Sequence, residues 1–284
     1  MMRWCVLFAI LAGSVFAQEE NVDIRVTKAP FSENTLVGEN EQPEWTTRRR
    51  FPTTRVYVQQ PPGAWGLSQW WRMDDSKGED ARHRFRTEAE IGIAKRTQLD
   101  LYLDTQRTRD DQWIYHDTAV EIRYALADWG KLPLNPTFYY EWQFVEDEHG
   151  PDKHEIKGLF GDAVKDWHYG VNLVYEQEVG EARETEYQIS QAVGYSVSDR
   201  LLSIGEEAKY AIVSEEGARG EAAHELSVGP SLQLRTSKDS HLDLVALFGV
   251  TDDAADIETF FVFGYAFGAE TPDGPRAPAS ARAE

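Results

Sequence analysis

The sequence predicts an all-β protein, an antiparallel up-and-down transmembrane β-barrel of about twelve strands. Apolar and polar residues alternate with a period of two from about Trp65 to Gly268, as in strands that have two different faces. Most of these segments are longer than the about 5–6 residues of an average strand and reach the about 9–11 that cross a bilayer. Short and long connections also follow one another in turn, as they do in outer-membrane barrels.

The first residues have the pattern of a secretory signal peptide. Arg3 precedes an apolar stretch that runs from Trp4 to Phe16, and Ala17 precedes polar residues. The apolar stretch is shorter than the about 20 residues that an anchor helix needs, so that alternative is disfavoured. We therefore expect residues 1–17 to be a signal peptide and the protein to be exported.

Composition excludes several classes of protein. The single cysteine, Cys5, lies in the expected signal peptide, so the mature chain would have no disulfide and no cysteine-based nucleophile or metal site. The formal net charge of −20 disfavours nucleic acid as a partner, because phosphate binding needs a basic surface. No later apolar run approaches 18 residues, so the sequence predicts no transmembrane helix.

Residues 18–63 are polar, contain proline and show no sustained periodicity. We expect them to form an N-terminal periplasmic extension that is partly disordered. Its basic cluster, Arg48, Arg49 and Arg50, is interpreted as part of a solvated tail, with contact to anionic lipid headgroups as the alternative. Residues 64–268 would then form the barrel and residues 269–284 a polar C-terminal tail.

Each barrel strand is predicted from its own alternation. Leu99, Leu101 and Leu103, for example, are separated by polar or amphipathic residues. Pro136, Pro230 and the outward-facing Glu206 do not fit the pattern, and a β-bulge would accommodate each of them. The expected strands are residues 65–73, 83–93, 98–108, 113–128, 134–146, 153–164, 167–179, 184–198, 201–215, 224–236, 241–252 and 257–268.

The connections set the strand count. Tight turns are expected near 94–97, 129–133, 165–166, 199–200 and 237–240, and longer links near 73–82, 109–112, 147–152, 180–183, 216–223 and 253–256. The last strand should run towards the periplasm, so counting backwards requires a first strand at 65–71 and an even total; the expected range is about ten to fourteen. Trp113, Trp129 and Trp167 lie at expected strand ends, where aromatic rings settle at headgroup level.

Two segments carry a family resemblance. Residues 85–93 (FRTEAEIGI) leading into 98–102 (QLDLY), together with 249–253 (GVTDD) before the aromatic last strand, resemble uncharacterised porin- or transporter-like outer-membrane barrels of Gram-negative bacteria. The resemblance implies the barrel fold and a location in the cell outer membrane, and it brings no catalytic motif. The chain departs from such barrels after Phe267, because they usually end on an aromatic residue and here a polar tail follows.

The polar face of each strand should point into the lumen, because an isolated charge at the lipid midplane costs about 2–4 kcal/mol. Acidic residues exceed basic ones on this face. Twelve strands fall between barrels filled by side chains and open channels, which begin at about 16 strands. The predicted lumen-lining residues are Arg86, Glu88, Glu90, Asp100, Glu121, Arg123, Glu141, Glu155, Lys157, Glu176, Glu186, Glu207, Lys209, Glu225, Arg235, Asp243 and Glu258.

These features predict a narrow passive channel or transporter for small cationic or neutral solutes, in contact with outer-membrane lipid and lipopolysaccharide. A non-conducting structural or adhesive barrel is the alternative, followed by a lipid-modifying enzyme that would pair His116 with Ser190. We expect no catalytic site, cofactor or metal site. The acidic link at 146–155 is interpreted as a solvated loop, with a divalent-cation site as the alternative. A soluble periplasmic β-sandwich is the rival fold.

Overall fold

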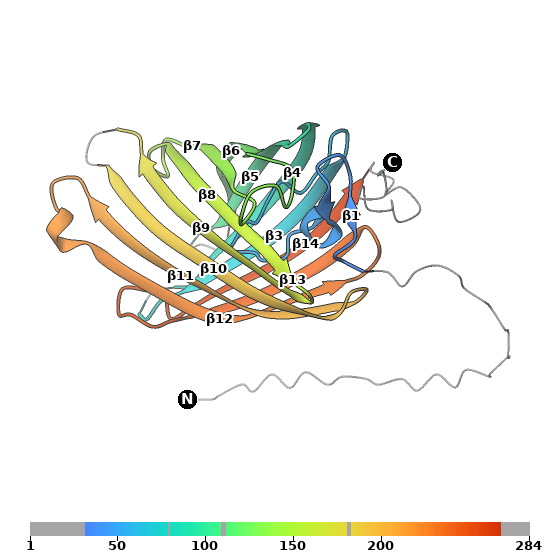
Figure 1. Ribbon diagram of the computed structural model, residues 1–284. Coiled ribbons are helices and arrows are strands. Elements are labelled where there is room, and N and C mark those ends of the chain that lie inside the picture. The colour runs from blue at the N-terminus through green and yellow to red at the C-terminus, as the bar shows by residue number, and fades with distance from the viewer. Residues whose placement is uncertain (1–31, 79, 109–111, 181–182, 268–284) are drawn as a thin grey trace, which may run out of the picture. The chain divides into compact units, whose positions relative to one another are not determined.

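Twelve antiparallel strands close into one barrel in the computed structural model, which describes residues 32–78, 80–108, 112–180 and 183–267 (Figure 1). The last strand pairs with the first, so the predicted barrel and strand number are confirmed and the β-sandwich is wrong. The strands are β3 (Trp65–Asp75), β4 (Arg82–Ala94), β5 (Thr97–Arg107), β6 (Trp113–Ala125), β7 (Thr137–Val145), β8 (Lys153–Val164), β9 (Trp167–Glu178), β10 (Glu184–Ser198), β11 (Leu202–Glu215), β12 (Ala223–Arg235), β13 (Ser240–Gly249) and β14 (Ile257–Phe267).

The inner and outer faces of the barrel differ in polarity, as the alternation of apolar and polar residues along each strand requires. On β5, Leu101 and Leu103 are exposed on the outside, whereas Asp100 and Asp104 are buried inside. Other strands repeat this pattern, so the outer surface is largely apolar and the interior largely charged. An apolar outer surface is the one that faces hydrocarbon in a transmembrane barrel. No described helix is long and apolar enough to cross a membrane.

Two of the three tryptophans that were expected at strand ends are found there. Trp113 and Trp167 begin β6 and β9 and are exposed at opposite ends of the barrel. Trp129 was predicted to lie at headgroup level, and this is wrong. Its ring packs edge-on against Trp45 and Tyr57, two residues from the N-terminal part of the chain.

The predicted alternation of short and long links fails at one place. β6 ends at Ala125 and β7 begins at Thr137, so the link 126–136 is long, although it lies among the short turns. Pro136 belongs to this link and removes no hydrogen bond from a strand.

The expected bulges at Pro230 and Glu206 are not found. The ladder between β12 and β13 skips Gly229 and Pro230, but the register is the same on both sides of the gap. Glu206 keeps its outward position, is exposed, and pairs in register with Val193 and Pro230. The barrel therefore accommodates a lost donor by a local gap in the ladder, without a shift of register.

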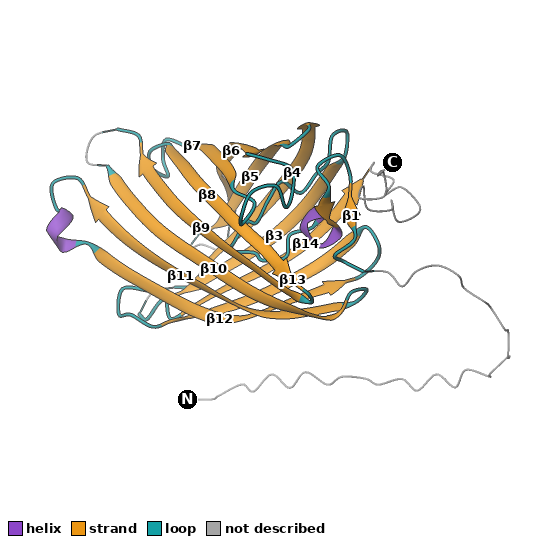
Figure 2. Cartoon of the chain, in the orientation of Figure 1, coloured by secondary structure: helices purple, strands orange, loops and turns teal. Residues whose placement is uncertain are grey.

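Residues 32–64 lie inside the barrel, and we call them the plug. They contain β1 (Leu36–Val37), β2 (Gln42–Pro43) and the short 3-10 helix η1 (Glu44–Thr47), and are otherwise loop (Figure 2). Trp45 and Val58 are fully buried, and Arg48–Arg50 expose no more than 8% of their surface. The interpretation of these arginines as part of a solvated tail is therefore wrong. The expected signal peptide, the residues before 32 and the C-terminal tail lie outside the described residues.

The plug closes the end of the barrel that carries the short turns. The Asn34 side chain donates to the carbonyl of Lys165 in the β8–β9 turn at 2.8 Å. The Arg48 guanidinium donates to the carbonyl of Lys238 in the β12–β13 turn at 2.9 Å. The backbone N–H of Trp129 donates to the carbonyl of Asn40 at 3.2 Å. These turns belong to different hairpins, so the plug is held from several sides of the same mouth.

An apolar cluster anchors the plug to the wall. The Trp45 ring stacks on His168 of β9 at 4.4 Å between ring centroids. The Tyr57 hydroxyl donates to the carbonyl of Ala127 at 2.6 Å. Burial raises the pKa of Tyr57 because it disfavours the charged phenolate, so the hydroxyl remains a donor. Aromatic rings of this size bury large areas and dominate packing energy where they occur.

Glycines on the inner face let the plug approach the wall closely. A Cβ at Gly92 would lie 2.0 Å from the carbonyl oxygen of Pro61, and one at Gly161 would lie 2.4 Å from a Val56 methyl carbon. The N–H of Gly63 also donates to the carbonyl of Gly92 at 2.9 Å. Real side chains cannot occupy these positions without moving the plug.

We expect Gly92→Ala to loosen the plug while the barrel stays closed. The added methyl group must displace Pro61, and overpacking of this kind costs about 1–3 kcal/mol. Trypsin should then cut the folded protein at Arg48–Arg50 about ten-fold faster. Gly220→Ala is the control, because nothing lies within 4 Å of the added Cβ there. Equal cleavage of both variants would contradict close packing at Gly92.

Candidate functional site: the charged lumen and its vestibule

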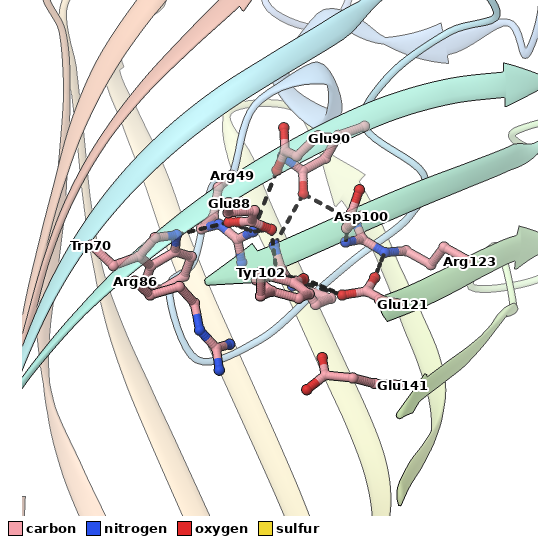
Figure 3. A network of polar contacts seen from close by, with 12 residues as sticks. Arg49, Trp70, Arg86, Glu88, Glu90, Asp100, Tyr102, Glu121, Arg123 and Glu141 are labelled. Carbon is pink, nitrogen blue, oxygen red and sulfur yellow. Dashed lines mark hydrogen bonds and ion pairs between the residues drawn. The ribbon is translucent and has the colours of Figure 1, made fainter. Parts of the chain in front are cut away.

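Glu88 is the centre of the contact between the plug and the wall (Figure 3). Arg49 of the plug donates to both of its carboxylate oxygens, at 2.7 and 2.9 Å. Arg55 of the plug donates to the same carboxylate at 2.9 Å, and the indole N–H of Trp70 does so at 2.7 Å. The Arg49 guanidinium also lies 4.2 Å from the centre of the Trp70 ring, a cation–π distance. A fully buried carboxylate is thus neutralised by two cations from the plug.

Arg123 of β6 forms a second buried contact with the plug. It is paired with Asp100 and with Glu121, the latter at 2.6 Å (Figure 3). Its guanidinium also donates to the carbonyl of Tyr57 at 3.2 Å and to the Gln59 side chain at 3.1 Å. Arg123 of the wall therefore binds the plug by donating to a backbone carbonyl and to a side-chain oxygen of the plug, in addition to the charged contact at Glu88.

A third contact lies at the other side of the mouth. Arg235 of β12 is paired with Glu33 at 3.1 Å and with Glu44 at 2.8 Å, both in the plug. Arg50 is paired with Glu33 at 2.8 Å. All of these side chains are buried, and breaking a buried ion pair by removing one partner costs about 3–5 kcal/mol.

Seven carboxylates occupy directly paired positions on the successive strands β4 to β10, and we call them the acidic row. Carboxylates placed directly opposite one another on neighbouring strands destabilise a sheet unless cations compensate them. The members in order are Glu90, Asp100, Glu121, Glu141, Glu155, Glu176 and Glu186.

The first three members of the row lie against the plug and are compensated there. Glu90 accepts hydrogen bonds from the side chains of Gln59 and Gln60, at 3.0 and 2.9 Å, and lies 3.4 Å from Arg49. Asp100 and Glu121 share Arg123. This half of the row is closed to solvent.

The other members face a cavity of about 630 Å³, which we call the vestibule. Plug residues Arg49, Thr53 and Arg55 contribute to its lining. It extends to His149 and Pro151 in the link between β7 and β8, at the end of the barrel away from the short turns. The lumen is therefore plugged at one end and hollow towards the other.

The vestibule carries charges of both signs on its wall. Arg72, Arg84 and Arg86 lie on β3 and β4, and in the order of the barrel these strands are opposite β9 and β10, which carry glutamates. Basic and acidic side chains are nearly balanced in number, unlike the acidic excess of the predicted lumen set. Among the described lining residues the basic ones are Arg49, Arg55, Arg72, Arg84, Arg86, Lys153, Lys157 and Lys209, and the acidic ones are Asp104, Glu141, Glu155, Glu176, Glu178, Glu184, Glu186, Glu225 and Glu258.

The predicted lumen-lining residues fall into two groups. Glu88, Glu90, Asp100, Glu121, Arg123, Glu207, Arg235 and Asp243 are buried, against the plug or the inner wall. Arg86, Glu141, Glu155, Lys157, Glu176, Glu186, Lys209, Glu225 and Glu258 line the vestibule.

Sequence reasoning missed several residues of this site. Arg84 and Lys153 share the inward parity of predicted residues on their strands, so extending the alternation to the strand ends would have found them. Arg72 lies on β3, for which the sequence predicted no lumen-lining residue. No periodic signal marks the arginines of the plug. The inner face also carries an apolar cluster where polar residues were expected, made of Trp70, Val245, Leu247, Phe260 and Val262.

The alternative sites considered from the sequence are not assembled. His116 contacts Arg84 at 2.9 Å and Asp117 at 2.6 Å, whereas the Ser190 hydroxyl contacts Thr53 and Thr54, so neither is a hydrogen-bond partner of the other. In the link 146–152, the Asp152 carboxylate accepts from the backbone of Val145. Among the described residues, no group of three His, Cys, Asp or Glu side chains is placed to hold a metal ion.

A closed barrel with an apolar outer surface and a charged interior has the architecture of an outer-membrane β-barrel. No family model matches the sequence, and no curated protein matches it. Among solved structures, it is similar to an outer-membrane channel from Pseudomonas putida F1, with a TM-score of 0.54 and 10% identity over 74% of this chain and 98% of that one. This similarity shows that the two chains share a fold.

Two porins also match, at lower scores. The NanC porin has a TM-score of 0.49 and 14% identity over 72% of this chain and 100% of that one. The KdgM porin in complex with disordered oligogalacturonate has a TM-score of 0.45 and 11% identity over 72% of this chain and 99% of that one.

We expect Glu88→Gln to weaken the docking of the plug by about 3 kcal/mol, because Arg49 and Arg55 would lose the carboxylate between them. Hydrogen exchange of the plug amides in detergent should speed up accordingly, while the barrel amides stay protected. Asp128→Asn is the matched control: it breaks the more exposed pair with Lys95, which contributes at most about 1 kcal/mol. Unchanged exchange in Glu88→Gln would refute the central role of Glu88.

Proposed function

We propose that the protein is an outer-membrane barrel that acts as a narrow passive channel or transporter for small cationic or neutral solutes. The vestibule is the observation that carries this proposal. Its volume of about 630 Å³ is that of a small-ligand site, and its lining is mostly polar. A solute would enter from the end with the long links and meet the plug at the bottom.

The outer surface of the barrel supports a location in the outer membrane. Exposed Trp113 and Trp167 mark the two ends of the apolar surface, as interfacial aromatic residues do in membrane barrels. We infer contact with outer-membrane lipid on this surface and with lipopolysaccharide at the end with the long links.

The plug supports a narrow or gated pathway. It occupies the mouth with the short turns, and its buried pairs at Glu88, Arg123 and Arg235 hold it there. Solute passage would then require local undocking of residues 32–64, which is a motion of a segment and leaves the strand ladder intact. The intact protein should conduct weakly.

A non-conducting structural or adhesive barrel is the second candidate, and the plug is also the observation in its favour. The two candidates predict different conductance after the plug is removed. A channel would pass current without the plug, and a non-conducting barrel would not. A lipid-modifying enzyme has no comparable support, because His116 and Ser190 have separate hydrogen-bond partners.

Planar-bilayer recordings test the proposal directly. Deletion of residues 32–63 should raise single-channel conductance several-fold over the full chain, because the obstruction and its arginines leave the lumen. Cation preference should increase, since the acidic row loses Arg49 and Arg55. Glu216→Gln, in an exposed loop pair with Arg183, is the control and should leave conductance unchanged.

Folding of the deletion variant is checked by heat-dependent mobility in gels and by circular dichroism. A folded variant that passes no current would overturn the channel and favour the non-conducting barrel. A folded variant that conducts anions better than cations would contradict the proposed class of solute.

A further inference from the structure

Glu206 of β11 is a carboxylate that points out of the barrel from the middle of an apolar surface. Its neighbours on the outer face of the same strand are Ile204 and Ala208. Across the sheet it pairs with Val193 of β10 and Pro230 of β12. All four neighbours are apolar, and Glu206 itself is exposed. Hydrocarbon cannot hydrogen-bond to a carboxylate, so this position is unfavourable unless another polar group reaches it.

Aromatic side chains on either side place Glu206 within the membrane-facing band. Tyr195 pairs with Ile204, towards the short turns, and packs against Trp167 with 5.0 Å between ring centroids. Tyr210 lies further along β11, towards the long links, and is exposed. Such rings settle at headgroup level in membrane proteins. The carboxylate therefore lies between the two levels, on the part of the surface that faces hydrocarbon.

Gln191 of β10 is the polar side chain next to Glu206 in the sheet. It is exposed on the outer face and pairs with Ala208, so it lies diagonally across from the carboxylate. Neither side chain has a hydrogen bond or ion pair within the part of the chain that the structure describes. By contrast, the amide of Gln69 on the outer face of β3 accepts a hydrogen bond from Thr87 at 2.9 Å. The wall satisfies that amide by itself and leaves Glu206 and Gln191 open.

The strand ladder is interrupted beside the same carboxylate. The pairing of β12 with β13 skips Gly229 and Pro230, and proline has no N–H to donate. Pro230 is the residue directly opposite Glu206, and Ala208 is the next outward residue on β11. Side chains of this size let neighbouring protein surfaces in a membrane approach closely. We call the surface formed by Gln191, Glu206, Ala208 and Pro230 the β10–β12 patch.

We propose that the β10–β12 patch is a contact between two copies of this chain in the membrane. The Gln191 amide of each copy donates to the Glu206 carboxylate of the other. The patch contains both a donor and an acceptor, so it complements itself, as a two-fold interface between identical chains requires. This inference goes beyond the proposed function. It depends on the outer-membrane location and holds whether or not the lumen conducts.

The tilt of the strands is compatible with this symmetry. Both copies have the same orientation in the membrane, so the two-fold axis runs along the membrane normal and the bonded groups must lie at similar depth. β10 and β11 are inclined in the barrel (Figure 1). At the tilt of about 35–45° that is usual for membrane barrels, the diagonal from Glu206 to Gln191 is level to within about 3 Å. An axis between the two side chains therefore brings each amide to the other copy's carboxylate.

Cysteine cross-linking of the full chain in lipid bilayers tests which face is in contact. Cys5 is the single cysteine, so in a Cys5→Ser background an introduced thiol reports one position. Ala208→Cys lies beside the proposed axis and should give a cross-linked dimer on mild oxidation. Leu101→Cys is the matched control and should give none. Leu101 is also exposed on the outer face, but β5 lies opposite β11 in the order of the barrel.

Exchange of the two polar residues tests the hydrogen bond itself, with the Kd of the dimer measured by energy transfer between labelled copies in bilayers. Glu206→Leu should raise this Kd about ten-fold or more, because the amide of the other copy loses a charged acceptor. Gln191→Glu should also raise it, since two carboxylates then face each other. The double variant Glu206→Gln, Gln191→Glu should return the Kd to within about three-fold of the original, because donor and acceptor have only changed places.

Gln69→Leu is the control for the exchange. It also removes a lipid-facing amide, but the partner of that amide is Thr87 of the same chain, so the Kd should change less than about two-fold. Heat-dependent mobility in gels confirms that each variant is folded before its Kd is compared. Conductance of the folded variants should equal that of the original chain, so the interface and the channel can fail separately.

Three results would overturn the proposal. A monomer at every protein-to-lipid ratio would remove the contact between copies and leave the β10–β12 patch to a different partner. Equal cross-linking of Ala208→Cys and Leu101→Cys would mean random collision in the bilayer. A double variant that associates as weakly as the single ones would show that Gln191 and Glu206 do not bond across the axis.

Discussion

Compensation of buried negative charge is the constraint on which the interior of this protein depends. The acidic row places carboxylates side by side on seven strands, in a lumen where unpaired charges are costly. Arginines of the plug, Arg123 of the wall and two lysines supply most of the compensating charge. The plug is thus part of the fold as well as an obstruction, because the barrel wall against which it packs would be left with unpaired carboxylates without it.

The same constraint divides the lumen into two halves. Where the plug packs, cations reach the three carboxylates of the acidic row, glycines such as Gly92 let the backbone come close, and solvent is excluded. Beyond the plug the strands continue, no other described segment fills the space, and the vestibule remains. Twelve strands enclose more volume than their own side chains fill, so the length of the plug decides how much of the lumen stays open.

Specific packing, in addition to charge, defines the position of the plug. Trp45 on His168 and Tyr57 on Trp129 are directional aromatic contacts that a sliding segment would lose. Buried ion pairs alone are weak sources of net stability because both partners lose their hydration. Together the two kinds of contact hold the plug in one position inside the barrel.

The sequence was sufficient for the barrel, its strand number and the inward side of residues such as Glu88, Asp100 and Glu141, because these follow from a period of two that every strand carries. It did not suffice for the plug. Arg49 and Arg55 sit in a segment without periodicity, and their partner Glu88 is distant in the chain, so only the closed barrel brings them together. The acidic row is also a tertiary property. Each glutamate is visible in its own strand, but whether Glu155 faces Glu141 and Glu176 depends on the register, which local pattern does not specify to the residue.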